Sequence, residues 1–177
     1  LQELIEGEAA AFDRILLATG FCGDSFCGLE TRHAELIIPR TDDCISLLLG
    51  SVENRRKLTE RCGTYFLTEG WLDSDKSIFA EYRHTVGRYG EARAKRVFGV
   101  MFAHYERVAV IDTGAYAVAP VYEKAQEMAN TLGLRCELLP GKQSYLRMLL
   151  TGPWTQAQFL ILPPGSTVER EMLSKLY

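Results

Sequence analysis

The stretch VAVIDTGAYAVAPVYEKAQEMANTLGLRCELL (Val108–Leu139) decides the fold class. Its first apolar run, Val108–Asp112, is typical of a buried strand. Pro120–Leu132 carries apolar residues at helical spacing, and Gly133 follows it at the position that glycine favours past a helix end. Leu134–Leu139 then alternates between apolar and polar residues as a strand does. This order predicts a parallel strand pair joined by a crossover helix.

The rest of the chain repeats this alternation, with a helical middle. It predicts an α/β protein with mostly parallel sheet(s) and flanking helices, arranged as two Rossmann-like halves around a cleft. One continuous sheet fits nearly as well. Further strands are predicted at Arg14–Thr19, Glu35–Pro39, Thr64–Thr68 and Phe159–Leu162, and helices at Cys44–Gly50, Val52–Arg61, Ile78–Tyr89, Glu91–Tyr105, Lys142–Leu150 and Glu169–Leu176.

The 177 residues suit a single α/β unit, 1–177, with lobes 1–77 and 106–177 joined by the helical segment 78–105. No repeat or low-complexity linker marks a boundary between them. The opening residues, 1–12, have the pattern of the middle of an amphipathic helix. We therefore expect the natural protein to begin earlier, with an amino-terminal strand missing here.

The composition indicates which classes of partner the protein is expected to bind and in which compartment it is expected to work. The net charge of −3 provides no broad basic field, so we expect neither nucleic acid nor a membrane surface as a partner. No apolar run is long enough for a membrane span, and no secretory signal is visible. Five cysteines, an odd number without close disulfide spacing, favour reduced thiols in a cytoplasmic protein.

Three cysteines lie just beyond the ends of two predicted strands, where open α/β proteins place their chemistry. Cys22 and Cys27 follow the first strand, and Cys44 follows the second. Thiolates on neighbouring loops can converge on one metal ion, since sulfur ligands favour zinc, copper(I) or iron–sulfur clusters. His33 or Asp43 could complete such a set. A simpler interpretation makes Cys44 a helix-start residue and Cys27 a packing residue.

Nucleophilic catalysis is the competing use of a thiol here. Cys44 is predicted to begin a helix, and a helix amino terminus raises the thiolate fraction. No histidine is obviously paired with it in the sequence, although His33, His84 or His104 could approach it in space.

Two further groups at strand ends could bind a substrate or cofactor. Arg40 could hold a carboxylate or phosphate by a bidentate contact, or pair with Asp42. Asp112, Thr113 and Gly114 close a strand and open a helix, so their free backbone N–H groups could hold an anion. A helix cap by the Thr113 hydroxyl is equally good chemistry.

Several segments resemble the uncharacterised prokaryotic family known as domain of unknown function 1638. They include an Asp-Cys-Ile run, a Leu-Gly-Ser run, a Gly-Trp pair and a terminal Leu-Pro-Pro-Gly, and together they cover most of the chain. The segments are GFCGDSFCGL (20–29), RTDDCISLLLGS (40–51), GTYFLTEGW (63–71), RYGEARAKRVFGVMFAHYERVAVIDTG (88–114) and LPPG (162–165).

The resemblance implies a cytoplasmic, anaerobic, one-carbon or corrinoid setting, because proteins of that family are often encoded beside corrinoid-dependent methyltransferase systems. Cys22 and Cys44 match positions expected to be cysteine in the family, whereas Cys27 departs from the pattern. The resemblance therefore favours a ligand pair of Cys22 and Cys44. It also implies a preceding strand with its own Cys-Gly.

The leading hypothesis is a cytoplasmic protein that binds a metal or metallo-cofactor through Cys22, Cys44 and, with less weight, Cys27, in support of methyl-transfer metabolism. The group could be zinc, an iron–sulfur cluster or a cobalt corrinoid. In this hypothesis Arg40, Asp43 and the turn at 112–114 shape the site or bind a small anionic ligand. The alternatives are a metal-free cysteine-dependent enzyme or methyltransferase, and a non-catalytic partner of a corrinoid protein or methyltransferase.

Overall fold

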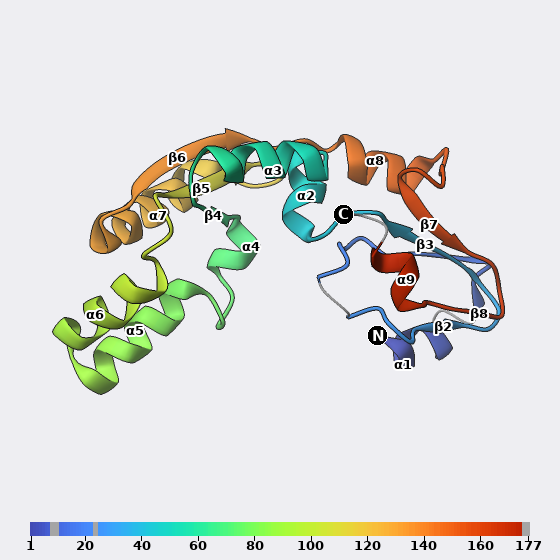
Figure 1. Ribbon diagram of the computed structural model, residues 1–177, viewed down its shortest axis with the longest axis horizontal. Helices are drawn as coiled ribbons and strands as arrows, with labels where there is room; N and C mark the ends of the chain where they lie inside the picture. The colour runs from blue at the N-terminus through green and yellow to red at the C-terminus, as the bar shows by residue number, and fades with distance from the viewer. Residues whose placement is uncertain (8–10, 23–24, 175–177) are drawn as a thin grey trace. The chain divides into compact units, whose positions relative to one another are not determined.

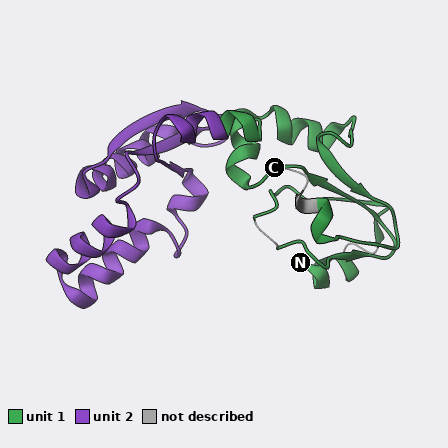
Figure 2. Cartoon of the chain, in the orientation of Figure 1, with its two compact units in different colours: residues 1–55, 142–177 green, residues 56–141 purple. Residues whose placement is uncertain are grey.

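The computed structural model describes residues 1–7, 11–22 and 25–174 (Figure 1). Its backbone divides into two compact units, which Figure 2 shows in different colours. Unit 1 comprises residues 1–55 and 142–177, and unit 2 comprises residues 56–141. This division differs from the predicted lobes, because the helical segment 78–105 belongs to unit 2 and the last part of the chain returns to unit 1.

Unit 1 contains a mixed three-stranded sheet in the order β1-β3-β7. The strands are β1 (Arg14–Leu16), β3 (Glu35–Pro39) and β7 (Phe159–Leu162). β1 runs parallel to β3, whereas β7 runs antiparallel to it. The prediction of parallel strands was therefore wrong for β7. The remaining elements of this unit are α1 (Gln2–Glu6), β2 (Glu30–Thr31), α2 (Cys44–Leu49), the first turn of α3 (Val52–Arg61), α8 (Ser144–Thr151), β8 (Ser166–Thr167) and α9 (Arg170–Ser174), with β2 and β8 forming a small antiparallel pair.

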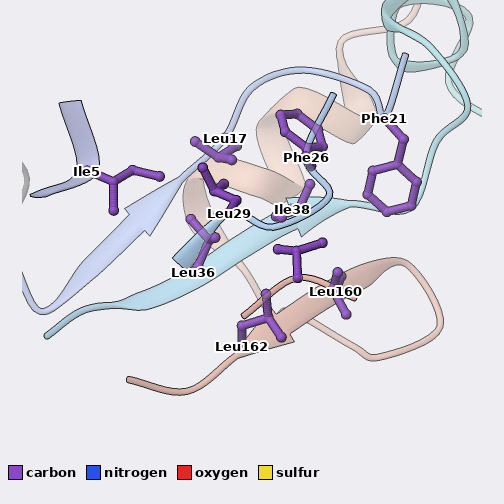
Figure 3. Packing of buried hydrophobic residues seen from close by; sticks show 10 residues of the cluster. Ile5, Leu17, Phe21, Phe26, Leu29, Leu36, Ile38, Leu160 and Leu162 are labelled. Atoms are coloured by element: carbon purple, nitrogen blue, oxygen red, sulfur yellow. The ribbon is translucent and has the colours of Figure 1, made fainter. Parts of the chain in front are cut away.

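The two faces of this sheet bury different residues, because successive side chains of a strand point to opposite faces. Leu36 and Ile38 of β3 lie on one face, in the cluster of side chains that Figure 3 shows. Ile37 packs on the other face against Leu47 of α2 and Leu149 of α8. All three β3 residues are fully buried, which explains why the segment reads as a continuous apolar run.

Unit 2 contains a parallel three-stranded sheet in the order β4-β5-β6. Helix α7 packs against β5 and β6, and its buried residues Val121, Ala125 and Ala129 are spaced by four. The strand–helix–strand order predicted from Val108–Leu139 is thus present. The elements of this unit are the rest of α3, β4 (Thr64–Leu67), α4 (Glu69–Leu72), α5 (Ile78–Tyr89), α6 (Glu91–Met101), β5 (Arg107–Asp112), α7 (Val118–Leu132) and β6 (Arg135–Pro140).

The structure confirms the α/β class, and the two Rossmann-like halves around a cleft stay a prediction. The loops after the strands fall into separate sets. Gly20–Gly28 and Arg40–Cys44 follow the parallel strands of unit 1, and three others follow the sheet of unit 2. Because β7 is antiparallel, the loop at 163–166 lies at the opposite edge of the unit 1 sheet from the loops that carry the cysteines.

Candidate functional site

Two loops of unit 1 lie side by side at the carboxyl ends of β1 and β3. The backbone N–H of Phe21 donates to the Thr41 carbonyl at 2.8 Å, and that of Cys22 donates to the Asp42 carbonyl at the same distance. These bonds continue the parallel pairing of the two strands beyond the sheet. They bring the loop that carries Cys22 against the loop that leads to Cys44.

Gly20 permits this close approach. A Cβ atom at this position would lie 2.3 Å from the backbone carbonyl carbon of Asp43, a distance that no side chain can adopt. Position 20, in the loop after β1, must therefore be glycine for the two loops to meet.

Two phenylalanines fix the loop after β1. Phe21 and Phe26 are each only 3% exposed, and their rings meet edge to face with centroids 6.0 Å apart (Figure 3). The Ser25 hydroxyl donates to the Phe21 carbonyl at 2.7 Å. Each phenylalanine precedes a cysteine, and both Cys22 and Cys27 are exposed. The apolar anchors thus leave the two following thiols at the surface.

Cys22 has an uncommon backbone conformation. Its φ is +41°, and among the described residues other than glycine it alone has a positive φ. This left-handed conformation costs about 1–2 kcal/mol for a residue with a Cβ. Such strain persists only where the surrounding structure imposes it, and it is frequent at functional sites.

Cys44 begins α2 directly after Asp43. The Asp43 carboxylate accepts a hydrogen bond from the Ser46 N–H at 2.9 Å and so caps the helix. Its second oxygen lies 2.8 Å from the Arg55 Nε. The neighbouring Asp42 carboxylate accepts from the Ser46 hydroxyl. The carboxylates of Asp42 and Asp43 therefore both interact with groups of unit 1.

The thiol of Cys44 is influenced by that of Cys22. Burial raises the pKa of Cys44 above its ordinary value, and the charges of Cys22 and Asp43 raise it further, against a smaller lowering by backbone hydrogen bonds of Cys44 and Ile45. The Cys44 residue as a whole is exposed, so this desolvation comes from the protein around its sulfur atom. Cys27 is not among the groups that shift the pKa. The structure thus places Cys22 and Cys44 together electrostatically.

The described residues contain no group of three or more histidine, cysteine, aspartate or glutamate side chains placed to hold a metal ion. His33 precedes β3 and therefore lies at the opposite end of that strand from Cys44. As a consequence, the suggestion that His33 completes the cysteine set was wrong.

Arg40 is directed toward the last strand and helix of unit 1. Its guanidinium donates to the backbone carbonyls of Phe159 in β7 and Met172 in α9, both at 3.4 Å. Asp42 lies near Arg55 instead, with 3.8 Å between the guanidinium and the carboxylate. Arg40 therefore connects elements of unit 1.

Asp112, Thr113 and Gly114 belong to unit 2, at the end of β5. The Asp112 carboxylate accepts from the Gly114 N–H at 2.9 Å, and the Thr113 hydroxyl accepts from the Ala115 N–H at 3.3 Å. The turn thus satisfies two of its own N–H groups. The prediction that the Thr113 hydroxyl caps a helix was wrong, because α7 begins only at Val118, with Ala117 as its N-cap. The other predicted site residues, Cys22, Cys27, Arg40, Asp43 and Cys44, all belong to unit 1.

Two residues beside the cysteines have no signal in the sequence. Arg55 reaches Asp43 from the first turn of α3, a contact that only the folded chain defines. Thr41 is fully buried, and its hydroxyl hydrogen-bonds to no side chain or backbone group in the described part of the chain. The run Arg40-Thr41-Asp42 reads as an ordinary polar loop, which conceals this burial.

Residues 1–150 match the family model described as protein of unknown function DUF1638. The chain belongs to the DUF1638 family. The match covers both cysteine loops and the whole of unit 2. No curated protein and no solved structure matches the chain. Within its described residues, this DUF1638 chain contains no helix with the length and apolar character needed to cross a membrane.

Proposed function

We propose that this DUF1638 protein binds a thiophilic metal ion or a metal-containing cofactor through Cys22 and Cys44. The observation that carries the proposal is the pairing of their two loops, made by backbone bonds from Phe21 and Cys22. That pairing brings two exposed thiols from separate strand ends within electrostatic reach of each other.

The chemistry of the two donors suits a soft metal. Thiolates select copper(I), zinc and iron–sulfur clusters over hard cations such as magnesium. Two protein ligands leave other coordination positions for groups that the bound cofactor or a substrate supplies. Asp43 would orient the site, because its carboxylate is held by the Ser46 N–H and by Arg55. A bound metal would supply Lewis acidity or, in a corrinoid, a carrier for a methyl group.

The same observations support metal binding over a metal-free nucleophile. A nucleophilic cysteine is activated by a lowered pKa. The pKa of Cys44 is raised instead, chiefly by burial and then by the charge of Cys22. A metal ion offsets that cost, since its positive charge stabilises two neighbouring thiolates together.

The proposed setting is one-carbon metabolism in the cytoplasm, with a corrinoid protein or methyltransferase as partner. This part of the proposal rests on the family resemblance and on the family's association with corrinoid methyltransferase systems. The metal site can be tested without it, because the two thiols would bind a soft ion in the isolated protein.

Elemental analysis and absorption spectroscopy of anaerobically purified protein test the proposal. We expect about one metal or metallo-cofactor per chain, with zinc, an iron–sulfur cluster and a corrinoid distinguished by element and spectrum. C22S and C44S should each lose most of it, with a fall in affinity on the order of 100-fold or more. Substoichiometric metal that C44S leaves unchanged would refute the proposal.

C27S is the matched control. Cys27 is exposed on the same loop as Cys22, but it does not contribute to the Cys44 pKa. Its replacement should leave the metal content and the spectrum of the protein as in the wild type. An equal loss in C27S and C44S would indicate a nonspecific thiol effect instead of the proposed pair.

A further inference from the structure

A second candidate binding site lies wholly within unit 2. It is a groove of about 500 Å³ between the connection from α4 to α5, helix α5 and helix α7, elements that Figure 1 labels. A smaller hollow of about 380 Å³ shares Tyr82, Arg83 and Thr131 with it, so the depression continues along α5. Volumes of this size are typical of sites for small ligands.

The groove combines an apolar floor with charges of both signs on its walls. Leu72 and Met128 are each 7% exposed and contribute apolar surface. Arg83 on α5 and Glu127 on α7 line it and have no ion-pair partner among the described residues. Lys124 is the other cation of the lining, and it lies 3.9 Å from Asp73. Asp75 also lines the groove and, like Arg83 and Glu127, has no ion-pair partner among the described residues. One cation and two anions therefore remain for a ligand.

Tyr82 adds a polar group without a partner. Its ring packs edge to face against Phe98, with centroids 5.1 Å apart. Its hydroxyl is shielded from solvent and hydrogen-bonds to nothing in the described part of the chain. Because this hydroxyl is inaccessible to solvent, a ligand in the groove does not reach it, and the charges on the groove walls carry the ligand assignment.

We infer that this groove binds a small zwitterion with an apolar side chain, an α-amino acid in chemical class. The carboxylate of the ligand would accept hydrogen bonds from Arg83. Its ammonium group would face Glu127, and its side chain would cover Leu72 and Met128. This inference is independent of the cysteine site, which belongs to unit 1.

Isothermal titration of the full chain with L-leucine and L-phenylalanine tests the inference. We expect binding of at least one of them, and at least tenfold weaker binding of 3-phenylpropionate and phenethylamine, which each lack one charge of phenylalanine. If neither amino acid binds, or if both single-charge analogues bind as well as phenylalanine, the inference is wrong.

Variants locate the binding. R83Q should weaken it at least tenfold, since it removes the donor to the carboxylate. R96Q makes the same charge change on an exposed residue of α6 outside the groove lining, so its affinity should stay within about twofold of wild type. C44S should also bind the amino acid with wild-type affinity. Equal affinity in R83Q and R96Q would overturn the assignment.

Discussion

The two units place loops at the carboxyl ends of parallel strands, and they use those loops differently. After β5 in unit 2, Asp112 accepts from the Gly114 N–H and the Tyr116 hydroxyl donates to the Ile111 carbonyl. After β1 and β3 in unit 1, the backbone groups bond across two loops, and the thiols of Cys22 and Cys44 stay exposed. A strand end becomes a candidate site only through the groups that local bonding leaves available.

Among the substitutions that test this comparison, G20A should change the free energy of unfolding most. The added Cβ would meet the Asp43 backbone at 2.3 Å, and backbone cannot move aside as a flexible side chain can. We expect a loss of about 3 kcal/mol in the free energy of unfolding, measured by urea denaturation. The cysteine loops would separate, so the variant should also lose metal.

G70A is the corresponding control in unit 2. Gly70 lies in α4 just after β4, and a Cβ there meets nothing within 4 Å. The substitution should leave stability unchanged or raise it by about 0.5–1 kcal/mol, because alanine favours helix more than glycine does. Equal destabilisation by G20A and G70A would contradict the close approach of the two loops.

D43A and D112A should differ by a smaller amount in the free energy of unfolding. Asp43 caps α2 and lies 2.8 Å from Arg55, whereas the Asp112 carboxylate bonds to the Gly114 N–H in an exposed turn. We expect D43A to cost about 1–2 kcal/mol and D112A less than about 1 kcal/mol in urea denaturation. The reverse order would show that the Asp112 carboxylate stabilises its turn more than the Asp43 carboxylate stabilises the start of α2.

The smallest effect concerns the coupling of the two thiols. The Cys22 charge raises the pKa of Cys44, so C22S should lower that pKa and speed alkylation of Cys44 severalfold at about pH 9. The rates follow from mass spectrometry of iodoacetamide-treated protein. Cys136 of unit 2 also has a pKa raised by burial, but Cys22 is not among its causes. Its alkylation rate should be the same in both proteins, and an unchanged Cys44 rate would argue against the coupling.

Much of the fold could be predicted because periodicity and end signals are local. β3, α3, α5 and β7 begin and end as predicted, and Asp43 caps α2. Strand direction was harder. The run Phe159–Leu162 is as apolar as a central parallel strand, and nothing in its residues indicates that it pairs antiparallel with β3.

The candidate site could be predicted in part for the same reason. Counting from strand ends grouped Cys22, Cys27 and Cys44, since that inference needs only parallel pairing of β1 and β3. The family resemblance then favoured the pair of Cys22 and Cys44. The roles of Gly20 and Arg55 depend on distances between segments that are separated in the chain. The groove of unit 2 could not be predicted from the sequence, because it is formed by helix surfaces and lies away from the strand ends.

X-ray absorption at the zinc edge of the zinc-loaded protein tests the central claim most directly. The account predicts two sulfur ligands at about 2.3 Å from zinc in the wild type and in C27S. C22S and C44S should each show one sulfur ligand or bind no zinc. A zinc shell of nitrogen and oxygen alone, or two sulfur ligands that persist in both C22S and C44S, would contradict a site built by these two cysteines.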